Sequence, residues 1–279
     1  MFEIPEYQTI ARQMSESMTG RRIAEGRLGN SPHKFVWDNL KPDEFSARVK
    51  GKTIGNASTR GRWLFVPLER GFILVFGECG GRIQLQRSES QFPKKHHLLL
   101  VFEDGSGLSA TTRMWGAMEL HEKGKERQRE YIRGMRTTPT EAGFTARYLV
   151  ELAKEAIANG KTTVKAILTQ DQLIPGLGNA IAQDIMFNAR LHPKQPLEDL
   201  DTGDLKVLHQ AIVKTLKVAI RLGGRNDEYD LHGNVGRYIR PMDKNAAGRP
   251  CPACGTRIEK IAYLGGACYF CPNCQSLKP

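Results

Sequence analysis

Four cysteines near the C-terminal end have the spacing of a metal site. Cys251 and Cys254 form one Cys-x-x-Cys pair, and Cys271 and Cys274 form a second pair after sixteen intervening residues. Each pair can turn tightly enough to aim two thiolates at one ion, and Zn²⁺ prefers four such ligands in a tetrahedral arrangement. Two disulfides or redox-active dithiols are the alternatives, and both suit a doubled Cys-x-x-Cys poorly. We predict one structural zinc ion, because four protein ligands leave no open position for catalysis.

A turn that contains two glycines is the second candidate site. Gly176 and Gly178 allow close approach to the backbone, and Asn179 begins the next helical segment. The N-terminus of a helix exposes amide groups that bind anions, so a phosphate is a natural ligand here. Lys165, one helical segment earlier, is placed to reach the same phosphate. Considered alone, these residues fit an ordinary glycine turn with an asparagine cap better than a binding site.

The net charge of the chain favours a polyanionic partner. Forty-one Lys and Arg oppose thirty Asp and Glu, which gives a formal charge of +11. Nucleic acid or an anionic membrane surface would fit this charge, and a merely basic soluble protein is the simpler alternative. The sequence has no uncharged apolar run of about 18 residues and no secretion signal at its start. We therefore expect a cytoplasmic protein without a membrane span, in which disulfides are rarely needed.

The first half of the chain has the pattern of a sheet domain. Ile10, Met14 and Met18 have helical spacing, and short apolar runs separated by turn residues follow them. The predicted strands are 62–68, 72–76, 82–86, 97–103 and 108–112. We predict a sheet domain with one N-terminal helix over residues 1–125 and a charged linker over residues 126–144.

The second half has helical periodicity and then loses it. An apolar stripe over 149–157 follows Thr145, a suitable N-cap, and Gly160 stands just beyond it. Further helices are predicted around 164–168, after Asn179 and after Asp201, whereas 223–248 is rich in glycine and charge and predicts a loop. We assign residues 145–248 to a helical domain with its following loop, and residues 249–279 to the zinc-binding module.

Taken in order, these segments resemble the Fpg/Nei family (formamidopyrimidine-DNA glycosylase and endonuclease VIII) over nearly the whole chain. Glu3-Ile-Pro-Glu6 is similar to the family's opening Glu-Leu-Pro-Glu, residues 175–179 to its helix-two-turn-helix signature, and the four cysteines to its zinc finger. The resemblance implies an α+β fold with an N-terminal β-sandwich flanked by a helix. It also implies a helix-two-turn-helix domain, a C-terminal β-hairpin zinc finger, and a DNA cleft between the lobes.

The resemblance implies a substrate and a set of contacts to it. The substrate is double-stranded DNA with a damaged base, flipped out of the stack, or an abasic site. Residues 223–236 match a mobile loop that can cover a flipped base, and Arg113 to Trp115 match a loop that probes the space opposite the lesion. The implied DNA-contacting residues are Arg62, Arg113, Trp115, Lys165, Gly178, Asn179, Arg225 and Arg257.

Position 2 departs from the family pattern. Family members expose an N-terminal proline whose secondary amine attacks the sugar, and this intermediate permits both base excision and strand cleavage. This chain has Phe2, and methionine is generally trimmed only before small residues, so we expect Met1 to be retained. The catalytic candidates are then the primary α-amine of Met1 and the carboxylate of Glu3, which can orient a water for hydrolysis. Glu6 is expected to be structural.

Other positions change lesion-reading residues of the family. Arg62 stands where the family has a lysine, and Glu78 stands where it has an intercalating methionine. The pair Met114-Trp115 replaces an arginine and a phenylalanine, and Gly266 replaces the arginine of the finger. A carboxylate is a poor wedge for a base stack, so an apolar wedge would have to come from Trp115.

Three functions remain open at this point. The first is a DNA glycosylase that excises an oxidised base, with its strand-cleaving AP-lyase step in doubt because Phe2 replaces the proline. The second is a non-catalytic protein that binds damaged or distorted DNA. The third is a nucleic-acid binding module unrelated to damage. In each case we expect a monomer with no membrane partner.

Overall fold

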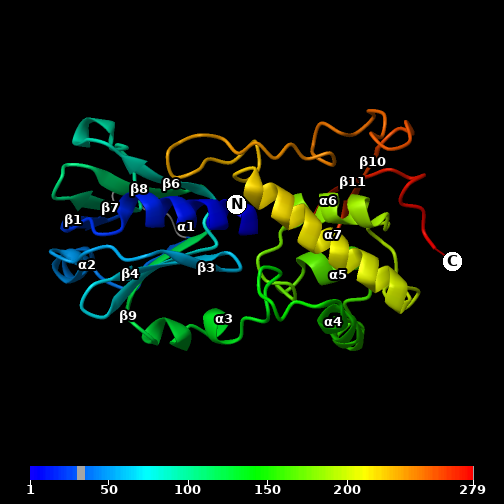
Figure 1. The fold of residues 1–279 in the computed structure, drawn as a ribbon, viewed down its shortest axis with the longest axis horizontal. Helices are drawn as coiled ribbons and strands as arrows, with labels where there is room; N and C mark the ends of the chain where they lie inside the picture. The colour runs from blue at the N-terminus through cyan, green and yellow to red at the C-terminus, as the bar shows by residue number, and fades with distance from the viewer. Residues whose placement is uncertain (30–34, 279) are drawn as a thin grey trace. The chain divides into compact units, whose positions relative to one another are not determined.

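The chain divides into two compact units (Figure 1). The computed structural model describes residues 1–29 and 35–278. Unit 1 comprises Met1–Met135 together with Leu222–Arg237, and unit 2 comprises Arg136–Arg221 together with Tyr238–Pro279. Within the described ranges, every helix is too short or too polar to span a bilayer.

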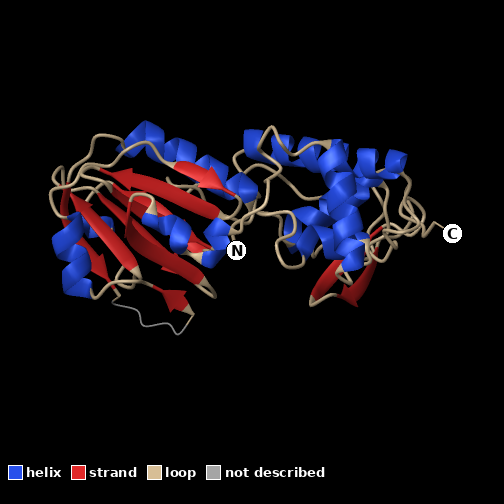
Figure 2. Cartoon of the chain, turned by 90° about the horizontal axis from the view of Figure 1, so that it is seen from below, coloured by secondary structure: helices blue, strands red, loops and turns tan. Residues whose placement is uncertain are grey.

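Unit 1 is built on two sheets, which contain most of the strands coloured red in Figure 2. The strands are β1 (Ile23–Leu28), β2 (Val36–Trp37), β3 (Ser58–Arg60), β4 (Trp63–Leu68), β5 (Phe72–Gly77), β6 (Gly81–Gln86), β7 (Leu98–Phe102), β8 (Gly107–Thr112) and β9 (Gly116–Glu122). One sheet has the order β1-β7-β8-β6, and the other has the order β2-β9-β5-β4-β3. Each pair of neighbours is antiparallel except β2 and β9, which run parallel.

The helix α1 (Ile4–Met18) shares one core with both sheets. Its buried residues Tyr7, Ile10 and Met14 belong to the same apolar cluster as Leu74 of β5 and Leu100 of β7. Two short helices, α2 (Pro42–Val49) and α3 (Glu130–Arg133), and two 3₁₀ turns, Glu89–Gln91 and Lys125–Gln128, complete the unit. The chain therefore enters the packed part of unit 1 at Phe2, directly after the exposed Met1.

Unit 2 is mainly helical. Its helices are α4 (Ala146–Ala158), α5 (Val164–Thr169), α6 (Asn179–Ala189) and α7 (Thr202–Arg221), and its two strands, β10 (Glu259–Tyr263) and β11 (Gly266–Phe270), form an antiparallel hairpin. Thr145 caps α4, because its hydroxyl accepts a hydrogen bond from the amide of Tyr148 at 3.1 Å. The apolar stripe predicted for this helix is buried at Leu149, Leu152, Ala153 and Ala156.

The α+β class predicted from the sequence is confirmed, and the five predicted strands correspond to β4 to β8 with small shifts at their ends. Sequence analysis missed β1, β9 and α2. β9 lies between β2 and β5, and its Met-Glu-Leu-His stretch does alternate apolar and polar residues, so a short strand signal was present there. The signal for α2 was present, since Pro42 at its first turn is followed by Asp43 and Glu44.

The segment Leu222–Arg237 packs with unit 1, whereas the sequence-based division grouped it with the helices. Leu231 is fully buried in the core of unit 1, and its carbonyl accepts a hydrogen bond from the amide of Leu85 at 2.8 Å. Gln13 on α1 adds two hydrogen bonds, to Asp230 at 2.8 Å and from the amide of Leu231 at 3.0 Å. These long-range contacts fix the segment, and its polar composition gives no hint of them.

Phe2 offers a direct test of this packing. Its side chain is completely buried and meets the ring of Tyr7 edge to face at 5.7 Å between centroids. We expect Phe2→Ala to lower the free energy of unfolding by about 3–5 kcal/mol, because the truncation leaves a cavity in the core. Denaturant titration measures the loss, with Ile239→Ala, at a position 74% exposed, as the matched surface truncation. A loss no larger than that of the control contradicts the role of Phe2 in the core.

Candidate functional site

Met1 is held at both ends of its backbone. Its α-ammonium group lies 3.2 Å from Oε1 of Glu228, and its carbonyl accepts a hydrogen bond from Nη2 of Arg225 at 2.7 Å. The next amide, that of Phe2, donates to the carbonyl of Cys79 at 2.9 Å. Chain ends usually fray unless they are tied down. The N-terminal amine of this chain therefore has a defined position on unit 1.

The nitrogen of Phe2 has no nucleophilic character. It belongs to a peptide bond, where resonance removes its lone pair, and it lies in a buried hydrogen bond. The thiol of Cys79 beside it is also inert, because burial raises its pKa to about 12 and keeps it protonated. An amine nucleophile at this corner must therefore be that of Met1, as the sequence suggested.

Glu3 caps the first helix from a buried position. Its side chain accepts a hydrogen bond from the backbone of Glu6, while the Glu6 side chain accepts one from the amide of Glu3 at 2.8 Å. This reciprocal arrangement satisfies amides that a helix N-terminus otherwise leaves without partners. Glu3 is only 4% exposed, and its Oε1 lies 3.8 Å from Nη1 of Arg225. The carboxylate thus has a structural task at the start of α1.

Arg225, which was expected to contact DNA, lies inside unit 1, and that contact stays a prediction. The residue is 4% exposed, and its guanidinium contacts Glu6 at 2.9 Å as well as Glu3, Glu228 and the carbonyl of Met1. Burial opposes the charge of Arg225, but the carboxylates of Glu6 and Glu3 outweigh this effect and hold its pKa above the usual value. Its Nε and Nη2 donate to protein oxygens, and its Nη1 lies 3.8 Å from Glu3.

Arg225 belongs to residues 223–236, the segment that resembles a mobile loop of the family. In the structure Arg82 stacks over the ring of Tyr229 at 4.2 Å, in addition to the contacts of Leu231 with β6. Gly236 passes so close to Gly224 that a Cβ at position 236 would lie 2.1 Å from the Gly224 carbonyl oxygen. The segment is therefore closed on itself and fastened to the core in this conformation.

Arg62 and Glu78 form an ion pair beside the N-terminus. Nη2 of Arg62 lies 2.7 Å from Oε2 of Glu78, and Nη1 donates to the sulfur of Met1 at 3.4 Å. Burial raises the pKa of Glu78 above its usual value, and the charge of Arg62 offsets part of that rise. The positive charge of Arg62 and the negative charge of Glu78 thus compensate each other.

A small pocket opens around Met1. It is lined by Met1, Gly80, Gly81, Arg82, Arg113, Met114, Asp227, Glu228 and Tyr229. A Cβ on Gly80 would lie 3.1 Å from the Cα of Met1 and 3.4 Å from its nitrogen, so only glycine leaves this much room for the terminal residue. The amide of Arg113 donates to the carbonyl of Gly80 at 2.8 Å, which places the exposed Arg113 side chain at the same pocket.

Trp115 belongs to an exposed aromatic group next to this pocket. Its ring stacks on Trp37 at 5.8 Å with an interplanar angle of 16°, and it meets Phe35 at 4.7 Å. Trp115 is 39% exposed and Trp37 is 43% exposed. The sequence analysis named Trp115 but missed Trp37, because the pairing of β2 with β9 that brings them together is not visible in the sequence.

In unit 2 the hairpin β10–β11 rests against the start of α6. Nδ2 of Asn179 donates to the carbonyl of Ala267 at 3.1 Å, and Nζ of Lys165 donates to the carbonyl of Tyr263. Lys165 is 1% exposed and its ammonium group supports the hairpin, and its expected contact with a phosphate stays a prediction. The residue that caps α6 is Gly178 in an extended conformation, and Asn179 is the first residue of the helix.

The position where the family has a finger arginine lies against Asn179. A Cβ on Gly266 would lie 3.3 Å from the Asn179 side chain, which is tighter than an ordinary contact. Arg257 is exposed and donates to the carbonyl of Gly248 at 3.3 Å. Arg257 therefore remains on the surface of the module, as a DNA-contacting residue would have to be.

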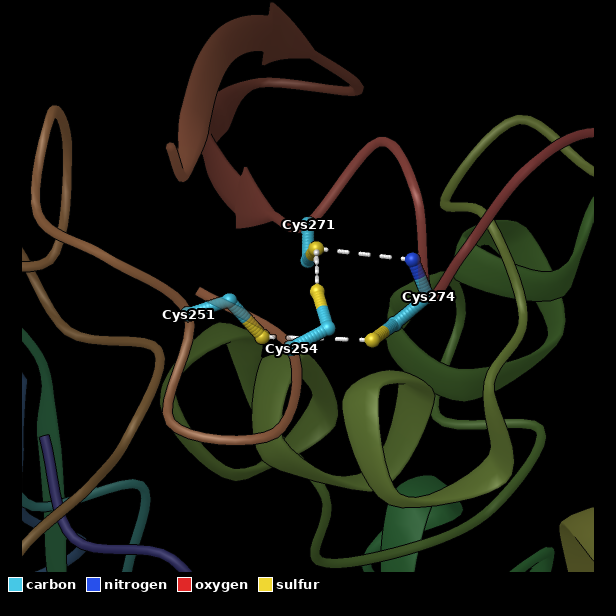
Figure 3. A group of neighbouring side chains, drawn as sticks. All are labelled: Cys251, Cys254, Cys271 and Cys274. Atoms are coloured by element: carbon cyan, nitrogen blue, oxygen red, sulfur yellow. Dashed lines mark hydrogen bonds between the residues drawn. The ribbon is translucent and has the colours of Figure 1, made fainter. Parts of the chain in front are cut away.

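The four cysteines of the doubled motif converge on one point, as Figure 3 shows. The sulfur atoms of Cys251, Cys254, Cys271 and Cys274 all lie within 4.8 Å of one another. Cys254 and Cys271 are 3.4 Å apart at sulfur, and Cys251 and Cys274 are 3.9 Å apart. Four thiolates around one Zn²⁺ ion would stand about 3.8 Å apart, given Zn–S bonds of about 2.3 Å. The cluster fits a tetrahedral metal ion.

The sulfur cluster also has outer contacts of the kind that metal-bound cysteines use. The amide of Ala253 donates to the sulfur of Cys251 and the amide of Cys274 donates to that of Cys271, each at 3.4 Å. Amide donors stabilise negative charge on sulfur, which a metal-bound thiolate carries. Cys268 is buried in β11 outside this group.

Comparison with family models gives two matches along the chain. Residues 1–118 match the formamidopyrimidine-DNA glycosylase N-terminal domain, and residues 138–229 match the formamidopyrimidine-DNA glycosylase H2TH domain. A curated formamidopyrimidine-DNA glycosylase from Halalkalibacterium halodurans is 29% identical over 279 residues, which cover 99% of this chain and 100% of the relative. One from Shouchella clausii is 29% identical over 281 residues, with 99% of each chain covered.

Solved structures agree with these matches. Wild-type Lactococcus lactis Fpg in complex with a DNA that contains N7-benzyl-Fapy-dG has a TM-score of 0.86 and 26% identity, with 98% of this chain and 99% of that chain covered. The same protein in complex with DNA that contains an abasic site has a TM-score of 0.85 and 25% identity, with the same coverage. The Fpg protein of Thermus thermophilus, at 24% identity and a TM-score of 0.83, supports the fold alone.

The metal site generates a prediction with a control in the same hairpin. We expect Cys251→Ser to reduce bound metal from one equivalent to none, because the loss of one thiolate opens the tetrahedral site. Elemental analysis after gel filtration measures the metal, and loss of the β10–β11 fold accompanies its release. Cys268→Ala, which removes a buried thiol outside the cluster, is expected to retain the metal. Equal metal content in both variants contradicts the assignment.

Proposed function

Because the chain belongs to the formamidopyrimidine-DNA glycosylase (Fpg/Nei) family, we propose that it binds damaged double-stranded DNA and excises an oxidised base as a DNA glycosylase. The observation that carries this proposal is the pairing of two reactive groups at one corner of unit 1. The α-amine of Met1 has a fixed position there, and the carboxylate of Glu3 lies two residues along the chain. The strand-cleaving step would depend on the Met1 amine, since Phe2 supplies none.

Glu3 is proposed as the proton-handling group of base excision. A carboxylate near the reacting sugar can orient a water and take its proton, which hydrolyses the N-glycosidic bond. The hydrogen bonds to Glu6 hold Glu3 in one orientation, and Nη1 of Arg225 lies 3.8 Å from its Oε1. The same contacts that cap the helix therefore also fix the orientation of the carboxylate.

DNA contacts are proposed for both units. The formal charge of +11 suits a polyanion. The exposed Arg113 and Trp115 next to the Met1 pocket suit a phosphate contact and an apolar wedge, respectively. At the start of α6, Gly178 and Asn179 present backbone amides and a side-chain amide that suit a phosphate, and Arg257 on the finger adds a positive charge.

One zinc ion is proposed for the cysteine cluster, where the four thiolates would hold it. Its task is structural, because the four protein sulfurs complete a tetrahedral coordination shell. The hairpin β10–β11 that connects the two cysteine pairs contacts Lys165 and Asn179, so the ion would fix the hairpin against the turn before α6.

A second candidate function is the recognition of damaged DNA without catalysis. Its support is the burial of Phe2 where the family has a reactive imino acid, together with the helix-capping task of Glu3. Both features have a structural explanation that requires no chemistry. Base release that depends on Glu3 separates the two candidates.

The first functional prediction concerns Glu3. We expect base release from at least one duplex carrying an oxidised purine or pyrimidine, and we expect Glu3→Gln to reduce it roughly a hundredfold, since general acid–base groups contribute about that much or more. Chromatography of the released base measures the rate. Glutamine preserves the shape and the capping oxygen, and Glu16→Gln on the exposed face of the same helix is the matched control. Absence of release on every lesion, with binding intact, favours the non-catalytic candidate.

The second functional prediction concerns Asn179. We expect Asn179→Ala to weaken binding about fivefold on damaged and intact duplexes of any sequence, which is the effect of one hydrogen bond of about 1 kcal/mol. Fluorescence anisotropy at fixed salt measures the affinities. Asn159→Ala, which removes an exposed asparagine at the end of α4, is expected to leave affinity unchanged. A loss confined to certain sequences contradicts a phosphate contact.

A further inference from the structure

Glu228 is the acidic residue that faces the N-terminal amine. Its Oε1 lies 3.2 Å from the Met1 nitrogen, although the two residues are separated by 227 positions in the chain. The Glu228 side chain is 17% exposed, and the same oxygen lies 3.5 Å from Nη2 of Arg225. The pocket around the pair also contains Arg82, Arg113 and Asp227. The carboxylate is thus close enough to exchange a proton with the amine directly.

Three other contacts hold the amine where Glu228 meets it. Arg225 donates to the carbonyl of Met1 at 2.7 Å, and Arg62 donates to the sulfur of Met1 at 3.4 Å. The amide of the next residue, Phe2, donates to the carbonyl of Cys79 at 2.9 Å. An ion pair on an exposed surface forms without additional contacts of this kind. The number of contacts on one terminal residue indicates that the position of its amine matters.

The chemistry of a primary amine explains why a carboxylate would be required here. A secondary amine such as proline condenses with an aldehyde to an iminium ion, which carries a permanent positive charge. A primary amine gives an imine that carries this charge only when it is protonated, and only the charged form withdraws electrons strongly from the sugar. A chain that uses Met1 in place of proline therefore needs an acid–base group beside the nitrogen.

We propose that Glu228 is a catalytic residue that moves the protons of imine formation between Met1 and the aldehyde of an abasic site. This inference deepens the proposed function and rests on it for the DNA substrate. Arg225 acts as a positioning residue, because it binds both Glu228 and the Met1 carbonyl. The substrate class is a ring-opened deoxyribose aldehyde in double-stranded DNA.

Every proton in the proposed step has a donor and an acceptor. Glu228 takes one proton from the Met1 ammonium, and the free amine forms a bond to C1′ of the aldehyde while one N–H proton moves to the oxygen. The Glu228 carboxylic acid then returns its proton to the hydroxyl group, the C–O bond breaks and water leaves. The product is a protonated imine beside an ionised Glu228, and no external oxidant or reductant takes part.

The test is reductive trapping on a duplex with one natural abasic site. Cyanoborohydride converts the imine to a stable secondary amine, and trypsin releases residues 1–12, which end at Arg12 and contain no lysine, so mass spectrometry separates a Met1 adduct from a lysine adduct. Intact mass first establishes that Met1 is present. We expect the wild-type adduct on Met1.

Two variants at Glu228 separate proton transfer from positioning. Glu228→Gln keeps an oxygen that can accept a hydrogen bond from the ammonium but cannot take its proton, and we expect trapping to slow roughly a hundredfold. Glu228→Ala is expected to slow trapping equally and to recover in proportion to added formate, which a merely structural role would not allow. Glu16→Gln serves as the control, and affinity for a tetrahydrofuran duplex, which has no aldehyde, is expected to stay within twofold in all variants.

The outcomes discriminate between this inference and the proposed function. An adduct on a lysine, or no adduct, overturns the role of Met1 even where base release from lesion duplexes persists. Trapping by Glu228→Gln at the wild-type rate overturns the role of Glu228 alone. Trapping on Met1 without base release from any lesion leaves this inference standing and removes base excision from the proposed function.

Discussion

The buried charge of Arg225 is the interaction on which the architecture of the N-terminal corner depends. Its guanidinium contacts Glu6 and Glu3 at the start of α1, Glu228 in its own segment, and the carbonyl of Met1. A buried ion is tolerated only where its partners are complete, and removing one partner of such a pair costs about 3–5 kcal/mol. The helix N-terminus, the segment 222–237 and the chain end are therefore fixed as one group.

This network explains how a retained Met1 changes the chemistry of the N-terminal corner. With Met1 in place, Phe2 becomes part of the core beside Tyr7, and its nitrogen becomes a peptide amide. The terminal amine then lies one residue further out, at Met1, in the space left open by Gly80. Glu228 and Arg225 are positioned to hold a group at this new place, and neither contact exists without the segment that crosses back from unit 2 to unit 1.

Unit 2 depends on a different constraint, the convergence of four sulfur atoms. The cysteine pairs flank the hairpin β10–β11, and the hairpin contacts Lys165 and the first residue of α6. Lys165 donates to the carbonyl of Tyr263 and Asn179 donates to that of Ala267, so both side chains hold the hairpin, whereas Arg257 is exposed. The cysteine cluster and the turn before α6 are consequently parts of one local structure.

The sequence by itself determined the features that depend on neighbouring residues or on strict spacing. The cysteine pairs, the cap at Thr145, the apolar runs of β4 to β8 and the turn before α6 were all visible, because turn chemistry and apolar patterning are local. The replacement of the N-terminal proline by Phe2 was visible as well. From these features the α+β fold and the family followed.

Only the tertiary structure decided which charged residues are available for function. Arg225 and Lys165 are of residue types that often bind ligands, yet both are buried against partners far away in the chain. Glu228, by contrast, lies in a short acidic stretch with no recognisable motif and contacts the N-terminal amine. Trp37 joins Trp115 only because β2 pairs with β9. The partner of a charge or a ring is set by long-range packing, and such packing leaves no periodic trace in a single sequence.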